Sequence, residues 1–156
     1  VTPISPIMLL MVEFLIYVIY SAVSLATVIP VAMLFWKVEM HGSWIAFLGS
    51  WLLTMVSTLS IGMMVGGVAK NAKTASVIAC ILYFPMLIFS GATLPFEVMP
   101  ETMQKIVQFF PMTQGIQLMK ATFLGTPFHN IWLPVLVMLG VTILCFGVAV
   151  KCFKWE

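Results

Sequence analysis

The amino-acid sequence predicts an all-α membrane protein with four transmembrane helices and two short helices between the third and the fourth. Hydrophobic residues make up 62% of the 156 residues and charged residues only 8%, whereas soluble domains have roughly 45–50% and about 25%. The charges divide the chain into four uncharged stretches, each with the ~20 residues that a helix needs to cross a bilayer. None of them alternates polar and apolar residues as a barrel strand does.

We expect one transmembrane domain over residues 1–156. Its four spans should lie at about residues 7–35, 44–69, 74–94 and 131–150. Trp36, Trp44 and Trp132 stand at the ends of these spans, where amphipathic rings favour the lipid headgroups. The chain begins at Val1 without Met, and its first apolar stretch is longer than a signal-peptide core of ~7–15 residues. We therefore interpret it as the C-terminal part of a protein whose N-terminal spans are missing.

The lysines predict which side of the membrane each connection occupies. If the spans alternate in direction, the N-terminal end, the Lys70–Lys73 turn and the C-terminal tail share one side. Their lysines lie next to spans and are mostly unbalanced, whereas three glutamates offset the lysines of the other side. The positive-inside rule therefore places the N-terminal end and the C-terminus of the chain in the cytoplasm.

A helix break is expected where the third span reaches the outer face. Ser90 and Gly91, followed by Pro95, should weaken or end the helix, because Gly is flexible and Pro lacks a backbone N–H. Residues 97–125 then mix polar and apolar residues at helical spacing. We expect them to form an outer amphipathic segment that lies at, or dips into, the membrane interface.

Two short helices are predicted within this segment. The first begins with Pro100, which suits a first helical position. Its apolar face is formed by residues at helical spacing: Met103, Ile106 and Phe110. The second should run from Thr113 to Leu124, with Gly125 as its C-terminal cap and Ile116, Met119 and Phe123 on one side. The alternative, an extended loop without function, would leave this periodicity unexplained.

Two features of the spans leave alternatives open. Gly62 and Gly66 form a G-x-x-x-G pair that lets another helix approach closely, either within the same chain or in a second subunit. Glu13 is the one acidic residue near the interior of a span. It is either an anchor at the interface or a residue that lines a polar path, since a charge at mid-membrane costs ~2.5–3.5 kcal/mol.

The sequence assigns no catalytic, cofactor-binding or metal-binding residue. The three cysteines and the histidines form no metal-ligand cluster, and no Ser-His-Asp or Cys-His constellation is present. The Gly62–Gly67 stretch has the first spacing of a phosphate loop, but Val68 stands where Lys is required. A net charge of +2 without any Arg gives no basic surface for nucleic acid. Energy for transport would therefore come from another chain.

Several motifs together resemble the membrane-spanning permease of type-2 ABC exporters, a family of bacterial plasma membranes. They are Val1–Pro6, the Phe89–Pro100 break, Pro111–Gly115 and Leu118–Gly125. The resemblance covers essentially the whole chain and corresponds to the last four of the family's six spans. It implies that the chain pairs with an ABC ATPase subunit, which uses ATP and Mg, and with a second copy or a paralogous permease.

The resemblance also implies roles for particular segments. The residues that match the end of the ATPase-coupling region are Thr2, Pro3, Ser5 and Pro6. The short helices of the outer segment would cap the exit of the substrate path. Many relatives carry a basic residue near the position of Glu13 and Arg near that of Lys120, so the resemblance assigns neither residue a role.

The function that follows is that of a non-catalytic subunit of an ATP-driven exporter in contact with membrane lipid. By family analogy the substrate is a hydrophobic drug-like or antimicrobial compound, which would make the protein part of a multidrug efflux system. Export of a lipid or polysaccharide precursor is the alternative within this class. A membrane enzyme would need convergent acidic or His residues, and a structural scaffold would leave the helix break unexplained.

Overall fold

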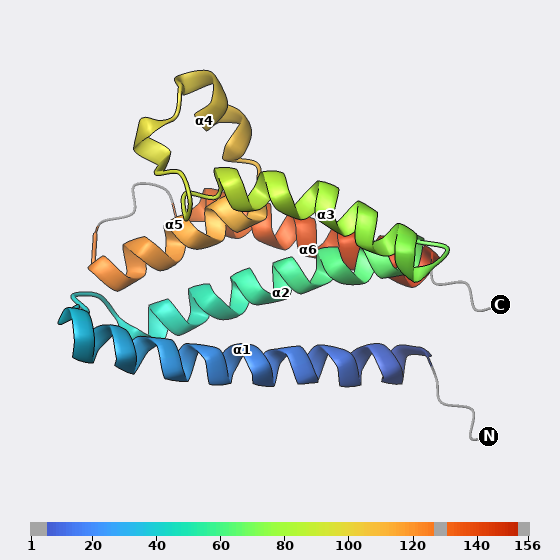
Figure 1. Ribbon diagram of the computed structural model, residues 1–156, viewed down its shortest axis with the longest axis horizontal. Coiled ribbons are helices and arrows are strands. Elements are labelled where there is room, and N and C mark those ends of the chain that lie inside the picture. Colours follow the sequence, from blue (N-terminus) through green and yellow to red (C-terminus); the bar gives the residue numbers. More distant parts are fainter. Residues whose placement is uncertain (1–5, 127–130, 153–156) are drawn as a thin grey trace. The chain divides into compact units, whose positions relative to one another are not determined.

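The computed structural model describes residues 6–126 and 131–152. These residues form helices and no strands, so the all-α prediction is confirmed (Figure 1). The elements are α1 (Pro6–Trp36), α2 (Trp44–Val68), α3 (Ala72–Phe89), the 3-10 turn η1 (Phe96–Val98), α4 (Glu101–Val107), α5 (Pro111–Leu124) and α6 (Trp132–Cys152). Within the described ranges, the four helices α1, α2, α3 and α6 are long and apolar enough to cross a bilayer.

The chain divides into two compact units, one up to Met40 and one from His41 onward. The first unit consists of α1, which continues through Pro30 and has no buried residue in its membrane span. Lys37 adopts a left-handed φ of 50° directly after this helix. The left-handed turn at Lys37 cannot continue an α-helix, so α1 ends at Trp36.

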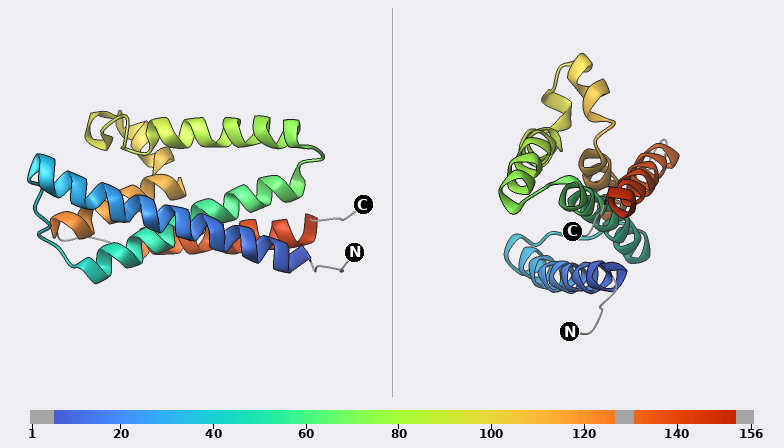
Figure 2. Two further views of the ribbon diagram at one scale, coloured as in Figure 1. Left: turned by 60° about the horizontal axis from the view of Figure 1, so that its bottom comes forward. Right: turned by 90° about the vertical axis from the view of Figure 1, so that its right-hand side faces the viewer.

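The second unit is built around α2, which contacts α3, α5 and α6 (Figure 2). Helix α5 also contacts α6, and it contacts α3 near its own start. With 14 residues, or ~21 Å, α5 is too short to cross the bilayer. Helix α4 extends away from α2 and α6 (Figure 1). The two short helices predicted between the last two spans are therefore present, and only α5 is packed among the spanning helices.

Three predicted helix boundaries need correction. Helix α3 ends at Phe89 and not at Leu94, because the backbone turns away at Gly91, where φ is 89°. Pro100 is the residue before α4 and not its first helical residue. Helix α5 begins at Pro111, two positions before Thr113, because a proline is well accommodated in the first helical turn.

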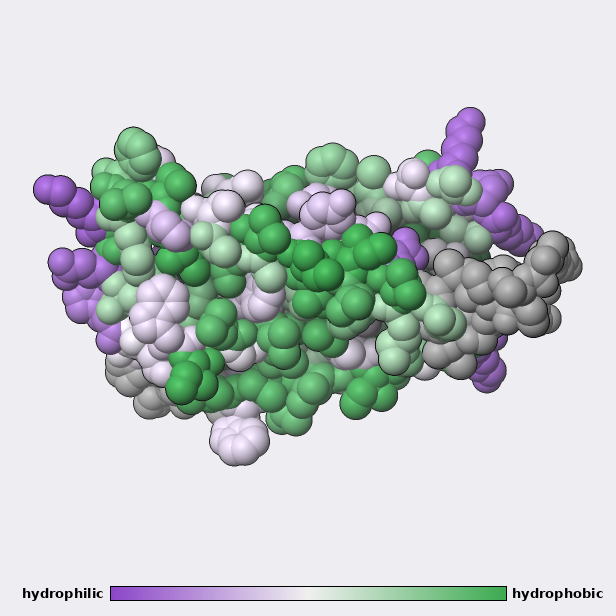
Figure 3. All heavy atoms as spheres, turned by 90° about the horizontal axis from the view of Figure 1, so that it is seen from below, coloured by the Kyte–Doolittle hydropathy of each residue, from purple (hydrophilic) through white to green (hydrophobic). Residues whose placement is uncertain are grey.

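Large apolar side chains cover the outside of the spanning helices. Ile143 and Leu144 of α6, for example, are each 70% exposed. Figure 3 shows hydrophobic residues across the middle of the face that it draws and hydrophilic residues toward its two sides. So large an exposed apolar surface would destabilise the protein in water. It is expected when lipid surrounds the helices. The chain is an integral membrane protein.

Candidate functional site

Side-chain hydroxyl groups cap the C-terminal end of α3. Ser90 Oγ donates a hydrogen bond to the Leu87 carbonyl at 2.8 Å. Thr93 Oγ1 lies 3.0 Å from the same carbonyl and 2.8 Å from the Ile88 carbonyl. The last carbonyls of a helix have no partner within the helix, and lipid offers none. These side chains therefore provide hydrogen-bond donors for the Leu87 and Ile88 carbonyls at the end of α3.

Two buried polar side chains at the start of α5 continue this pairing. Thr113 and Gln114 are 0% and 2% exposed. Thr113 Oγ1 donates to the carbonyl of Phe89, the last residue of α3, at 3.4 Å. Gln114 Nε2 donates to the Gln108 carbonyl at 2.6 Å. Helix α5 is thus joined both to the end of α3 and to the segment that precedes it.

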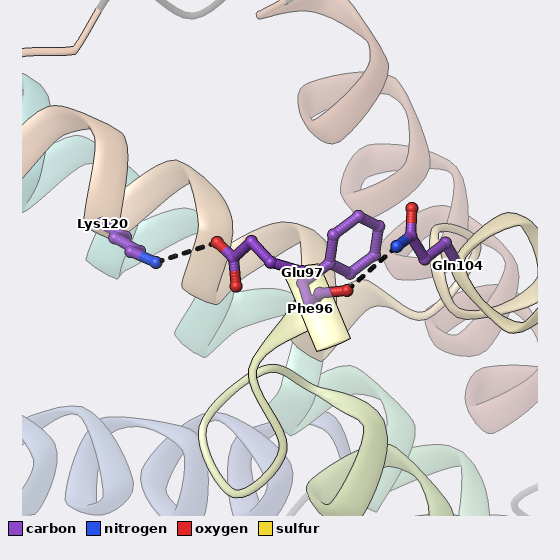
Figure 4. Close-up of polar contacts among 4 residues, drawn as sticks. All are labelled: Phe96, Glu97, Gln104 and Lys120. Atoms are coloured by element: carbon purple, nitrogen blue, oxygen red, sulfur yellow. Dashed lines mark hydrogen bonds and ion pairs between the residues drawn. The ribbon is translucent and has the colours of Figure 1, made fainter. Parts of the chain in front are cut away.

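Polar contacts also organise the segment between α3 and α5 (Figure 4). Gln104 Nε2 donates to the carbonyls of Phe96 and Met99, at 3.2 and 2.8 Å, and so joins α4 to η1. Glu97 forms an ion pair with Lys120 of α5 over 3.4 Å, with both side chains more than half exposed. A hydrogen bond from its own backbone N–H, and then the Lys120 ammonium, lower the pKa of Glu97. This segment is thereby tied to the outside of α5.

The middle of α5 packs against α2 through small and hydroxyl-bearing residues. A Cβ added at Gly115 would overlap the side chain of Thr54. The Thr54 hydroxyl donates to the Ser50 carbonyl of its own helix at 2.6 Å. Ser57, which is fully buried, donates to the Met138 carbonyl of α6 at 3.3 Å. Close approach and hydrogen bonds hold these helices together, as expected where lipid provides no hydrophobic driving force.

These buried hydroxyls have a structural role. Ser50, Thr54 and Ser60 donate to backbone carbonyls of α2 itself, at 2.6 to 2.7 Å. We conclude that these hydroxyls satisfy backbone carbonyls of α2 and leave small side chains where α2 meets α5 and α6.

The C-terminal end of α5 is clamped to the residues that precede α2. Gly125 has a left-handed φ of 67° and donates its N–H to the Ala121 carbonyl, so its predicted role as a helix cap is confirmed. The backbone N–H groups of His41 and Gly42 both donate to the Phe123 carbonyl, at 3.2 and 3.1 Å. A Cβ at Gly42 would overlap the Thr122 carbonyl. Both ends of α5 are therefore attached to other segments of the second unit.

Two largely apolar openings flank α5. One, of about 480 Å³, lies between α2, α5 and α6 and is lined by residues that include Gly42, Ala46 and Gly125. The other, of about 250 Å³, lies between α2, α3 and the start of α5 and includes Gly62. Among the residues that the structure describes, no charged side chain lines either opening. Helix α5 thus separates two cavities suited to apolar groups.

The G-x-x-x-G pair is open in the structure. A Cβ added at Gly62 or Gly66 would have no atom within 4 Å. Within the second unit, no described helix therefore packs closely against this pair. The close approaches occur instead at Gly42, Gly115 and Gly125, which stand outside any such motif.

The remaining predicted residues lie in several places. Pro95 precedes η1, and Pro100 precedes α4. On α4 the predicted apolar face is uneven: Met103 and the following Phe110 are half-buried, whereas Ile106 is 59% exposed. Pro6 is the first residue of α1. The other residues of the predicted coupling segment, Thr2, Pro3 and Ser5, lie outside the described residues.

Sequence reasoning did not identify the buried polar residues around α5. Ser50, Thr54 and Ser57 follow one another at helical spacing within a span, which was a readable signal. Thr113 and Gln114 carried no such signal, because their partners Phe89 and Gln108 are paired with them only by the fold. The half-buried positions Ile116, Met119 and Phe123 form the predicted stripe, but the fully buried face of α5 passes through Gly115, Leu118 and Ala121.

The family of the chain follows from comparison of its sequence with known protein families. Residues 1–151 match the family described as ABC-2 family transporter protein. The chain belongs to this family. No solved structure matches it.

The curated relatives of the chain are bacterial proteins, and some of them are named for transport or export. It is 25% identical to the inner membrane transport permease YhhJ of Escherichia coli (strain K12), over 99% of this chain and 42% of that protein. It is 31% identical to nodulation protein J of Rhizobium leguminosarum bv. viciae, over 63% of this chain and 36% of that protein. It is 26% identical to the capsule polysaccharide export inner-membrane protein CtrC of Neisseria meningitidis, over 72% and 43%. The chain spans about two fifths of the length of these relatives.

Proposed function

We propose that the chain is the C-terminal part of a transport permease that exports its substrate with energy from a separate ABC ATPase. The observation that carries the proposal is the position of α5, a non-spanning helix packed on α2 and α6 and attached at both ends. A span with only a structural role would need neither the break after α3 nor a short helix such as α5 packed among the spanning helices. Where a helix ends at membrane depth, its backbone polar groups need partners. Non-helical backbone is tolerated there when it is buried in protein or lines a water-filled cavity, as in many transporters.

The cavities beside α5 support an apolar or amphipathic substrate. Within residues 6–126 and 131–152, both are lined mainly by aliphatic and small side chains and by no charged one. On this basis we propose export of a hydrophobic drug-like or antimicrobial compound, as in multidrug efflux. The name of the Neisseria relative makes a polysaccharide precursor the second candidate.

The proposed orientation follows the lysines. Residues 37–41 and the segment from Ser90 to Thr126 would face outward, and the Lys70–Lys73 turn would face the cytoplasm. The ATPase would then act on the side where α2 ends and α3 begins. The protein would work as a pair of permease copies or paralogues, with the open Gly62 face available to a second subunit.

Inside-out membrane vesicles can test the proposal. The full-length protein would be produced with the ATPase encoded beside it, and ATP-dependent accumulation would be measured for hydrophobic drugs, antimicrobial peptides, lipid precursors and polysaccharide precursors. We expect accumulation of one class that is abolished when the phosphate-loop lysine of the ATPase is replaced. If ATP hydrolysis and accumulation are both indifferent to the permease for every class, the proposal is wrong.

A further inference from the structure

The polar residues of α1 are gathered on one face of the helix. Glu13, Tyr17, Tyr20, Ser24 and Thr27 follow one another at intervals of three or four residues. At ~100° per residue they occupy an arc of about 80°, and no apolar residue between positions 11 and 30 falls within it. Only Ser21 among the polar residues of that stretch lies elsewhere. We call these five residues the Glu13 face.

The Glu13 face runs from one membrane boundary to the middle of the bilayer. If Trp36 marks the opposite boundary, Glu13 lies ~35 Å from it along the helix and Thr27 ~14 Å. The hydrocarbon layer is ~30 Å thick. Glu13 is then at headgroup level, where a carboxylate is tolerated, whereas Ser24 and Thr27 are near the midplane.

Anchoring at the interface explains only part of this pattern. It accounts for Glu13 and Tyr17, because charged and aromatic residues favour the headgroup region. It does not account for two hydroxyl residues at mid-depth on the same face. All five side chains of the Glu13 face are exposed, and the Thr27 hydroxyl donates only to the Ser24 carbonyl of its own helix among the contacts observed, at 2.8 Å. Polar residues within a span normally face protein or a water-filled path.

We propose that the Glu13 face lines the substrate path and binds amphipathic cations, an inference that rests on the transport function proposed above. Glu13 holds the cationic group at the membrane boundary. Tyr17 and Tyr20, one and two turns further along, lie against the apolar body of the substrate and can also attract the cation through their ring faces. The hydroxyls of Ser24 and Thr27 keep the part of the path near the bilayer midplane hydrated.

The charge of the chain supports a cation in this position. Glu13 is the only charged residue of α1. The basic residues within the other three spanning helices are Lys73 and Lys151, and each stands in a terminal turn. An amphipathic cation itself gathers at the headgroup level, so Glu13 is placed where such a substrate arrives. A neutral sugar chain would gain nothing from a carboxylate at that point.

Cysteine labelling tests whether the Glu13 face is wet. In the full-length protein with its ATPase, Cys80, Cys145 and Cys152 would be replaced by Ala, and single cysteines introduced as S24C, T27C, V23C and A26C. Each pair of neighbours lies at the same depth but on different faces. We expect a hydrophilic maleimide to label S24C and T27C at least tenfold faster than V23C and A26C. Equal rates, or no labelling at any of the four positions, would overturn the proposal.

Binding of tetraphenylphosphonium, a permanent amphipathic cation, tests the ligand class. Using the full-length protein in lipid nanodiscs without ATP, we expect Glu13→Gln to raise the Kd at least tenfold, while Glu13→Asp changes it less than threefold. Glu101→Gln, on an exposed turn of α4, is the matched control and should leave the Kd unchanged. The proposal is overturned if the wild-type protein does not bind the cation or if Glu13→Gln binds it equally well.

The two proposals can fail separately. If ATP-dependent export of another class persists while the cation does not bind, the transport function stands and the inference about Glu13 is wrong. If the cation binds through Glu13 but no substrate class is exported, the binding site stands and the transport function is wrong.

Discussion

Gly115 of α5 lies against Thr54 of α2 so closely that a Cβ at position 115 would overlap the threonine side chain. This contact holds α5 against α2, the spanning helix at the centre of the second unit. Because lipid competes equally well for apolar surface, the contact depends on shape, and glycine supplies that shape. The position of α5 between the two cavities depends on it.

We expect Gly115→Ala to destabilise the protein by about 1–3 kcal/mol, because the added methyl group overpacks the contact. Thr54→Ala removes the two atoms with which that methyl group would overlap most, so the double variant should regain most of the loss. Thermal unfolding of the full-length protein in nanodiscs would measure all three variants. Gly147→Ala is the control, since a Cβ there meets no atom within 4 Å. Additive losses in the double variant would contradict the contact.

Gly42→Ala should be more damaging than Gly115→Ala. The Cβ at position 42 would overlap the backbone carbonyl of Thr122, and a backbone atom cannot rotate out of the way as a side chain can. We expect the clamp at the end of α5 to open, with faster hydrogen exchange at the His41 and Gly42 amides, which now donate to Phe123. Hydrogen exchange with mass spectrometry would measure it. Ser43→Ala, at the exposed neighbouring position, should leave exchange unchanged.

The contact between α2 and α6 should tolerate loss of a hydroxyl better than added bulk. Ser57→Ala removes one hydrogen bond to the Met138 carbonyl, which also accepts from Thr142 at 2.7 Å, so we expect a loss below about 1 kcal/mol. Ser57→Leu should cost about 1–3 kcal/mol, because the site is fully buried. Thr58→Leu, one position away and exposed, should be close to neutral. Denaturation of the same nanodisc samples would rank the variants, and equal losses for both leucine variants would refute this packing.

The ion pair between Glu97 and Lys120 should be visible in a titration. The pKa of Glu97 lies below its ordinary value of 4.5, first because its own backbone N–H donates to the carboxylate and then because of Lys120. A lowered pKa in the folded state stabilises the protein above the ordinary value, and the contribution is lost as the pH falls through the lowered pKa. The effect on stability should be small, since both groups are exposed.

NMR titration of labelled glutamate carboxyls would test this assignment. Lys120→Met should raise the Glu97 midpoint without bringing it back to the ordinary value, because the backbone hydrogen bond remains. Lys105→Met, on α4, should leave the midpoint unchanged. An unchanged midpoint in Lys120→Met would show that the pair does not form in solution.

Much of the fold followed from local chemistry. The four spans could be predicted because charges interrupt apolar stretches of the right length. The cap at Gly125 could be predicted because a left-handed residue there needs glycine. The end of α3 was placed too late, at Leu94, because Ser90, Gly91 and Pro95 are all helix breakers and only the left-handed backbone at Gly91 shows where the helix stops.

The sequence by itself determined that this protein belongs in a bilayer, where its helices lie along the chain, and that a break precedes two short helices. Only the tertiary structure decided which helix faces meet. In a soluble protein the apolar face of each helix packs into the core, so the buried face can be predicted from the periodicity of the sequence. In a membrane an apolar face is equally stable against lipid, so the periodicity does not show which face is buried. Small and polar residues such as Gly115, Ser57 and Thr113 therefore share the buried contacts with apolar residues such as Met138, while the motif at Gly62 and Gly66 has no close neighbour.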